Sequence, residues 1–430
     1  MTTDATVNAA AAPAAPGKPP AFAALRVRGY RAHFITYVLA MMADNIEHVI
    51  SYWVAFQKFH SPALGGFAVL SHWLPFLAFS VVVGALNDRF DSRRIIQVGM
   101  GLFMLASAGW GYFFATDSLT VGGAMVLLAV HGCAGVLWQT SSQMLLHDIV
   151  GPGPALASAV RLNATARYLG ILVGPAVGGL IMLTLGPTRG IFLNMVFYLP
   201  LLLWLWRAPY GRHFRGDHPA QKRAVRGVAD ILETLAEIRG LPIIAPMVVL
   251  AGAASFFIGN SYQAQMPGFA NDLGHGDPGT AYSALLAADA AGALTAGLLL
   301  ESRSGWLPTT VPTALRLALL WAAALIGFAR LHTYALALPV LFAAGFFELS
   351  FSSMAMALAQ IHAPAASRGR ILGLFNMAAL GLRAFSGITV GLIGSLIGIH
   401  ASLAGSAIVF GLLIAALLVR RLRARPVASS

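Results

Sequence analysis

Residues 84–94 read GALNDRFDSRR, a short and strongly charged stretch between two long apolar runs. Five of its eleven side chains are Asp or Arg, whereas residues 66–83 and 95–115 contain no Asp, Glu, Lys or Arg. A helix needs roughly 20 apolar residues to cross a bilayer, and the run on each side is about that long. We therefore expect residues 84–94 to form a turn at a membrane surface, joining two transmembrane helices.

The composition of the whole chain supports a membrane protein. Of its 430 residues 58% are hydrophobic and only 10% are charged, and the mean hydropathy is +0.74. Soluble proteins have about 25% charged residues. The formal charge of +12 would suggest a nucleic-acid partner in a soluble protein. Here the basic residues lie between apolar segments, so they indicate membrane topology and no nucleic-acid partner is expected.

Turn residues and charges divide the chain into twelve candidate spans, so we predict an all-α membrane protein with twelve transmembrane helices. The predicted spans are residues 32–58, 66–87, 94–115, 120–147, 157–185, 190–206, 243–266, 279–300, 308–329, 333–359, 369–394 and 398–420.

The longest connection separates six spans from six, which predicts two pseudo-symmetric six-helix bundles, residues 31–206 and 243–420. Residues 1–30 are Ala/Pro-rich at their start and predicted to be a disordered N-terminus, and residues 421–430 a basic tail. The connection 207–242 begins basic and then becomes amphipathic. We interpret its second part as a linker helix that lies on the cytoplasmic membrane face or under the bundles.

The distribution of basic residues predicts the orientation. With twelve spans both termini lie on one side, and 21 of the 28 Lys and Arg residues lie on that side. The opposite loops contain only Lys58, Arg189 and Arg330, and the other four basic residues lie in or at the edge of spans. Cytoplasmic loops carry the excess of Lys and Arg, so both termini are expected in the cytoplasm of a cell with a bacterial inner membrane.

The stretch 84–94 resembles the signature of the loop between spans two and three in the major facilitator superfamily. The residues that match are Gly84, Leu86, Asp88, Arg89, Arg93 and Arg94. Asp91 stands where that signature usually has glycine. The resemblance implies a transporter working by alternating access, with these residues as a conformational gate loop. GLLLESR, residues 297–303, is an eroded copy in which Glu301 takes the place of Asp88.

Span five contains GILVGPAVGG, residues 170–179. Small residues let a second helix pack at contact distance, and the proline bends the helix. The spacing resembles the antiporter signature of the drug:proton antiporter branch, and the matching residues are Gly170, Gly174, Pro175, Gly178 and Gly179. Other stretches resemble the subfamily of macrolide and enterobactin exporters. In span four His131 replaces the arginine that is typical of the drug:proton antiporter branch. This histidine could carry protons or could be a packing residue.

Four of the 16 acidic residues lie well inside predicted spans, namely Asp44, Glu47, Asp289 and Glu348. Each charge at mid-membrane costs about 2.5–3.5 kcal/mol on insertion scales. Asp44, Glu47 and His48 share one helix face, and by the resemblance they and His131 and Glu348 lie on cavity-lining helices. We expect all of these residues to face a central cavity. One carboxyl group of the Asp44–Glu47 pair is expected to bind a proton or to form an ion pair with His48. Asp289 is expected at the cavity or between the bundles.

These observations favour a monomeric secondary transporter that exports a small amphipathic molecule, of the drug or siderophore type, in exchange for protons across a lipid bilayer. A proton-coupled importer of a metabolite and a lipid-handling or sensory membrane protein are the alternatives. We expect no enzyme and no cofactor beyond the proton gradient, because the sequence contains no phosphate-binding loop and no catalytic motif. It also contains no recognisable metal motif, and the single Cys133 excludes a cysteine cluster.

Overall fold

The computed structural model describes residues 20–60, 62–211, 225–259, 261–274, 281–303 and 305–423. Within these ranges the chain forms helices and connecting turns, and no strand. Most of the predicted disordered N-terminus, the basic part of the linker (212–224) and most of the C-terminal tail lie outside the described residues.

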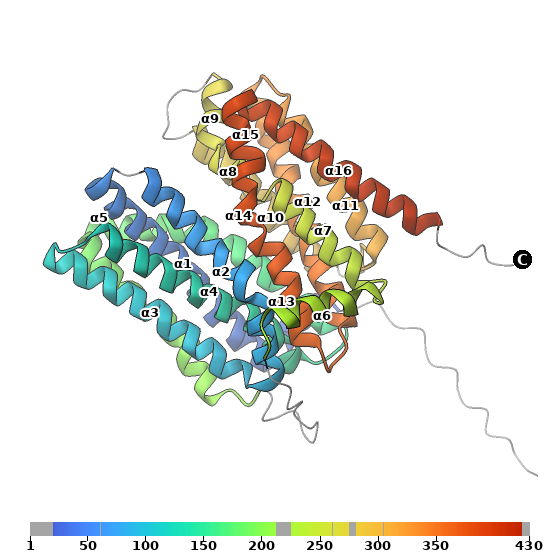
Figure 1. The fold of residues 1–430 in the computed structure, drawn as a ribbon, viewed down its shortest axis with the longest axis horizontal. Helices are drawn as coiled ribbons and strands as arrows, with labels where there is room; N and C mark the ends of the chain where they lie inside the picture. Colours follow the sequence, from blue (N-terminus) through green and yellow to red (C-terminus); the bar gives the residue numbers. More distant parts are fainter. Residues whose placement is uncertain are drawn as a thin grey trace, which may run out of the picture.

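The N-terminal half forms five helices, drawn in blue to green in Figure 1. They are α1 (Arg28–Phe59), α2 (Pro62–Arg89), α3 (Ser92–Thr116), α4 (Val121–Val150) and α5 (Pro154–Arg207). Gly186, at φ 76°, breaks the 54-residue helix α5 just before Pro187. This kink separates two arms that correspond to the predicted spans five and six, because a left-handed residue cannot continue a right-handed helix.

The C-terminal half contains shorter elements. After α6 (Val228–Arg239) they are α7 (Ile244–Phe257), α8 (Ser261–Ala264), α9 (Met266–Asp272), α10 (Ala281–Ser302), α11 (Val311–Ala329), α12 (Tyr334–His362), α13 (Arg368–Asn376), α14 (Arg383–Ser386), α15 (Ile393–Ile397) and α16 (Ile399–Arg423). The predicted span seven is broken after Phe257, and span eleven is interrupted by π-helical turns at Met377–Gly381 and Gly387–Leu392. Such turns often occur at functional sites.

The described part of the chain has ten helical segments long and apolar enough to cross a membrane. The kinked α5 counts once among them and provides two spans. Helix α1 is not among the ten, because it contains charged residues, but it packs along α5 in the N-terminal bundle. The twelve predicted spans therefore all correspond to helical segments, and the chain has the expected all-α architecture.

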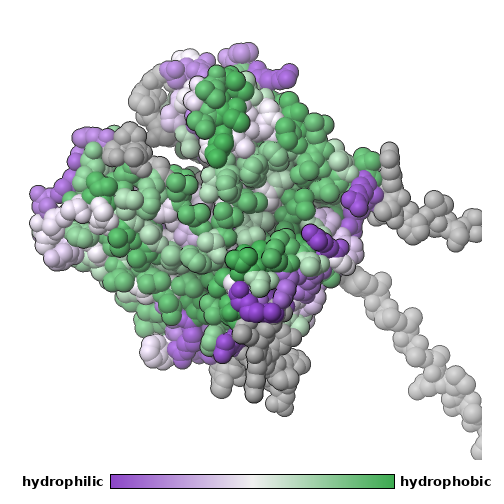
Figure 2. Space-filling model, viewed as in Figure 1, coloured by the Kyte–Doolittle hydropathy of each residue, from purple (hydrophilic) through white to green (hydrophobic). Residues whose placement is uncertain are grey.

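The two bundles lie side by side, and polar residues gather at their ends. Figure 1 shows α1–α5 as one lobe and α7–α16 as the other, with α6 and α13 close together at one end. Figure 2 shows an apolar surface over the middle of the molecule, with hydrophilic residues towards the ends. We call the end formed by residues 89–94, 208–211, 225–243 and 363–370 the basic end.

One sequence prediction needs correction in this part of the fold. Disorder was expected through residue 30, but Ala23–Arg26 form a 3-10 turn and Arg28 begins α1. The buried Ala24 N–H donates a 3.1 Å hydrogen bond to Ser158 Oγ, which fixes this segment to α5. Linker helix α6 is amphipathic as expected, and its apolar face is covered in part: Ile238 is buried, while Leu232 is exposed.

The glycine face of α5 packs directly against α1. A Cβ on Gly170 would lie 2.8 Å from the Met41 Cβ, and one on Gly174 would lie 2.5 Å from the Asn45 Cβ. Gly178 is also close to α1, at Ile46, whereas a Cβ on Gly179 would meet nothing within 4 Å. The predicted close-packing face is therefore Gly170, Gly174 and Gly178, and it holds the helix that contains Asp44 and Glu47.

This packing predicts different effects for two alanine substitutions on one helix. Gly174→Ala adds a methyl group where α1 leaves no space, and overpacking typically costs about 1–3 kcal/mol. We expect its Tm in detergent, measured by intrinsic tryptophan fluorescence, to fall by several degrees. The control Gly179→Ala adds the same group to open space and should leave the Tm unchanged or slightly higher. Equal Tm values for the two variants would contradict the packing argument.

Candidate functional site

A cavity of about 470 Å³ lies between the two bundles. Helices α4 and α5 line it on the N-terminal side, and α7, α10, α12 and the interrupted span eleven line it on the C-terminal side. Most of its wall is apolar, and its charged residues are Arg167, Asp289, Glu348 and Arg383. Clefts of this size with a few convergent polar groups are typical ligand sites.

Two carboxyl groups form the polar centre of the cavity wall. Asp289 on α10 and Glu348 on α12 are both buried, and the Tyr262 hydroxyl lies between them. The Tyr262 oxygen is 3.2 and 3.3 Å from the two carboxylate oxygens of Asp289 and 3.3 Å from Glu348 Oε2. Gln263 Nε2 donates to Asp289 Oδ2 at 2.9 Å. The break in span seven places Tyr262 and Gln263 here, which the sequence analysis did not anticipate.

Two arginines face these carboxyl groups from the other elements. Arg383 lies on α14, between the two π-helical turns, with its guanidinium 5.1 Å from the ring centroid of Trp73 on α2. Arg167 comes from α5 and lines the same cavity. Both interact electrostatically with Glu348. The cavity can therefore contact either sign of charge on a bound molecule, beside an aromatic and aliphatic wall.

The other predicted acidic residues form a separate network inside the N-terminal bundle. His131 on α4 bridges two side chains of α1: its Nε2 is 2.9 Å from Asp44 Oδ1, and its Nδ1 is 2.8 Å from Glu47 Oε1. The Ser107 hydroxyl on α3 donates to the other Glu47 oxygen. Asp44, Glu47 and His131 are each at most 6% exposed, and none of them lines the cavity between the bundles. The expectation that they face the central cavity is therefore wrong.

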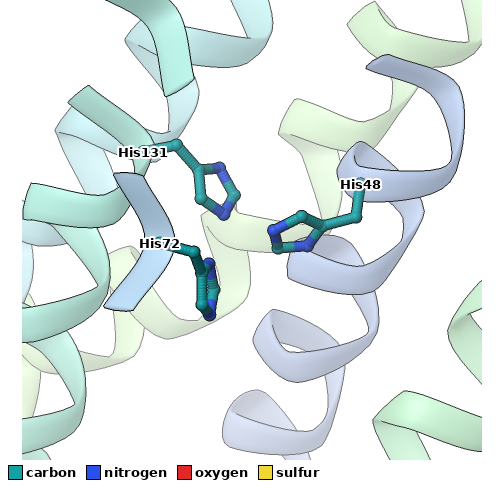
Figure 3. Close-up of side chains that lie close together, drawn as sticks. All are labelled: His48, His72 and His131. Carbon is teal, nitrogen blue, oxygen red and sulfur yellow. The ribbon is translucent and has the colours of Figure 1, made fainter. Parts of the chain in front are cut away.

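His48 and His72 complete this network towards α2. His48 Nδ1 lies 2.7 Å from the main-chain oxygen of Asp44, while the hydrogen-bonding partner of the Asp44 carboxylate is His131. The His48 ring centroid is 4.6 Å from that of His131 and 4.9 Å from that of His72. Figure 3 shows the three rings turned towards a common space between α1, α2 and α4. No local sequence pattern predicted that these three histidines meet, because they lie 24 and 59 residues apart.

Asp88 in the predicted gate loop joins the two bundles at the basic end. Its carboxylate accepts the N–H groups of Gly369, at 2.8 Å, and Arg370, at 3.2 Å, at the N-terminus of α13. Negative charge is stabilised at a helix N-terminus. A Cβ on Gly84 would lie 2.1 Å from the Gly369 carbonyl oxygen, so α2 and α13 cross in contact. Arg370 also lies 3.7 Å from Glu233 and from Glu237 of α6.

The contacts described for the other gate-loop residues lie within the N-terminal half. Asp91 begins α3 by accepting the Arg93 N–H at 2.9 Å, so this departure from the family pattern provides a helix cap. Arg93 pairs with Asp91 at 2.7 Å and donates to the Ala208 carbonyl. Arg94 donates to Gln97 at 2.8 Å, and the Arg89 guanidinium lies 5.2 Å from the Phe90 ring centroid. These arginines stabilise the turn around Asp88.

The eroded copy of the loop makes a matching contact. Glu301, at the end of α10, is fully buried, accepts from Ser158 Oγ at 2.5 Å and pairs with Arg161 Nε at 2.5 Å. A Cβ on Gly297 would lie 2.0 Å from Thr165 Oγ1, so α10 and α5 also cross in contact. We call the Asp88 and Glu301 contacts together the basic-end clasp. Each joins one bundle to the other.

Comparisons with known proteins agree with this architecture. The family model described as Major Facilitator Superfamily matches residues 33–387. The human organic anion transporter MFSD10 (TETRAN) has a TM-score of 0.70 at 16% identity, covering 91% of this chain and 99% of that one. The Escherichia coli fucose:proton symporter FucP has a TM-score of 0.70 at 13% identity, covering 92% and 98%. At these identities the two structures show the fold alone.

Curated relatives are similar over a shorter region. The multidrug efflux pump Tap of Mycobacterium tuberculosis is 29% identical over 157 residues, 35% of this chain and 36% of the relative. The tetracenomycin C resistance and export protein of Streptomyces glaucescens is 29% identical over 136 residues, 31% and 24%. The chain thus spans about a third or less of the length of these relatives. The family match over residues 33–387, the fold and the two copies of the gate loop all agree. They show that the chain belongs to the Major Facilitator Superfamily of multi-pass membrane transporters.

Proposed function

We propose that this transporter exports small amphipathic molecules in exchange for protons, by alternating access of the cavity between its bundles. The observation that supports this most directly is the carboxyl pair Asp289 and Glu348, buried in the wall of that cavity around one tyrosine hydroxyl. A buried charge without full compensation is costly, so the pair is suited to bind either a proton or a cationic group.

The cavity wall supports a substrate with apolar bulk and a positive charge. Apolar side chains from both bundles can bury the bulk, and the carboxyl pair can bind the charged group. Arg167 and Arg383 could bind an anionic group of the same molecule, so a zwitterion also fits. The relatives named for multidrug efflux and tetracenomycin export agree with this substrate class.

Exchange follows if proton and substrate compete for the same carboxyl groups. A proton on Asp289 or Glu348 removes the negative charge that attracts a cation, and a bound cation disfavours the proton. The Tyr262 hydroxyl can donate to one carboxylate at a time, so it allows the proton to be held by either partner. Competition of this kind links the two binding events through one site.

The positive-inside rule supports the orientation of the chain in the membrane. It assigns the basic end to the cytoplasm, so both termini would lie on that side of an inner membrane. The basic-end clasp closes this end in the described structure. In the proposed cycle the clasp opens to admit substrate from the cytoplasm, and the cavity then releases it on the opposite side as protons bind.

The competition can be tested through the pH dependence of binding. Ethidium, a fluorescent aromatic cation, should bind the purified wild-type chain about 10-fold more weakly at pH 6 than at pH 8, within the usual range of linked binding. In Glu348→Gln and Asp289→Asn we expect this pH dependence to be lost, together with proton-driven ethidium transport. The control Asp117→Asn removes an exposed carboxylate that pairs with Lys58 and should behave like the wild type. Normal transport and pH dependence in both cavity variants would refute the proposal.

The direction of transport has its own test. In proteoliposomes with ethidium inside, an inward proton gradient should drive ethidium out through the wild-type chain. Ethidium accumulation inside the vesicles under the same gradient would instead indicate an importer. Ethidium movement that responds to neither an inward nor an outward proton gradient would exclude proton coupling.

The clasp predicts a change in conformational equilibrium. Asp88→Asn and Glu301→Gln each remove a charge-assisted contact between bundles, and hydrogen bonds to charged groups contribute about 1.5–3 kcal/mol. Spin labels placed on Gln97 and Arg239, in chains with Cys133 replaced by Ser, should report longer distances between the basic ends of the bundles in the double variant. The exposed control Asp117→Asn should leave the distances unchanged. Identical distance distributions would show that the clasp does not hold this end closed.

A further inference from the structure

The histidine cluster inside the N-terminal bundle is not part of the cavity between the bundles. It combines His48 on α1, His72 on α2 and His131 on α4, with Asp44 and Glu47 against His131. One nitrogen of each ring lies within 4.8 Å of the others. Figure 3 shows that the rings come from three different helices and converge. Hydrogen-bonded packing explains one buried histidine, but it does not explain why three of them meet beside two carboxylates.

The spacing of the three nitrogens suits a shared metal ion. Atoms that are all within 4.8 Å of each other have a common point within about 2.8 Å of each, which is 4.8 divided by √3. Imidazole nitrogens bind Zn²⁺ at about 2.0–2.1 Å. Each ring would have to move by less than about 1 Å, a shift that small rotations of side-chain dihedrals provide. Neutral imidazoles are common ligands of zinc and similar divalent ions.

The contacts of His131 already have the form seen around metal-bound histidines. Glu47 Oε1 lies 2.8 Å from Nδ1, so Glu47 can hold the proton on that nitrogen and leave Nε2 to bind the ion. Carboxylates that orient ligating histidines in this way are frequent in metal sites. Ser107 in turn donates to Glu47 and fixes its position. Asp44 Oδ1, 2.9 Å from Nε2, is close enough to act as a fourth ligand.

Two further observations point to an occupant. His72 Nδ1 is buried and has no hydrogen-bond partner among the described residues. The ion pairs of Asp44 and Glu47 within the described ranges are both with His131. With neutral imidazoles the cluster would hold two negative charges in a low dielectric, and such charge requires compensation. One divalent cation provides it.

From this geometry we infer that His48, His72 and His131, with Asp44, bind one divalent transition-metal ion of the zinc type, and that Glu47 positions His131. The ion joins α1, α2 and α4 within one bundle. It is therefore a resident ion that stabilises the bundle, and its site is separate from the cavity used by the transported molecule. This inference does not depend on the proposed direction or substrate of transport.

Metal titration of the full-length chain in detergent, free of any polyhistidine tag, tests the inference. Calorimetry with ZnCl₂ should show one ion per chain, and Zn²⁺ should raise the Tm, because a ligand that binds only the folded state stabilises it. Co²⁺, a spectroscopic substitute for Zn²⁺, should give the visible ligand-field bands of a four-coordinate site. The absence of stoichiometric binding would overturn the inference and leave protons on the histidines as the compensating charge.

Matched variants locate the ion. His48→Gln and His72→Gln should lose the Zn²⁺-dependent rise in Tm and the Co²⁺ bands, whereas Glu47→Gln should keep the bands with affinity about 10–100-fold weaker. His400→Gln, on α16 of the other bundle, is the control and should bind like the wild type. Unchanged binding in the His48 and His72 variants would place the ion elsewhere and refute the site.

A cysteine replacement keeps the test decisive if a glutamine variant does not fold. Cysteine is also a zinc ligand, so His72→Cys should retain one Co²⁺ per chain and add a thiolate-to-cobalt charge-transfer band in the near ultraviolet. Folding is monitored by elution volume on a sizing column. A folded His72→Cys chain that binds Co²⁺ without the new band would show that residue 72 does not touch the ion.

Discussion

A charge inside a membrane must be paired, bound to a ligand or exposed to a water-filled space, and this constraint organises the structure. The four acidic residues predicted within spans follow it in two different ways. Asp44 and Glu47 are enclosed by helices of one bundle and share His131. Asp289 and Glu348 line the space between bundles and share Tyr262. The first pair belongs to the interior of one bundle, and the second to a surface whose surroundings would change in the proposed cycle.

The close packing of glycines makes these arrangements possible. Gly170, Gly174 and Gly178 bring α5 against α1, on the helix that contains the first acidic pair. At the other bundle a Cβ on Gly345 would lie 1.9 Å from the main-chain oxygen of Asp289, so α12 and α10 touch where the second pair lies. Small residues bring polar groups of adjacent helices within hydrogen-bonding distance, and the helices then exclude lipid from them.

Much of the fold could be predicted from the sequence, because apolar length and charged turns determine membrane spans. The stretch 84–94 and its copy at 297–303 indicated the family. The contents of the sites were harder to predict. Asp44 and His48 share a helix face, but only the partner helix decides whether that face meets the cavity, and here α4 covers it with His131. Tyr262 and the histidine cluster depend on a broken helix and on three separate helices, so no local pattern revealed them.

In the proposed cycle the basic-end clasp must be strong enough to close the cavity and weak enough to open. Its two halves are small: Asp88 accepts two N–H groups of α13, and Glu301 pairs with Arg161 and accepts from Ser158. Contacts of this kind contribute a few kcal/mol together. Conformations populated in one cycle differ by a similar amount, so binding of a proton or a substrate can shift the balance between them. The clasp lies at the boundary between the bundles, so opening it need not break the apolar contacts inside each bundle. In the proposed cycle this separation would keep the proposed ion, or the buried charge network, fixed in one bundle while the cavity opens and closes.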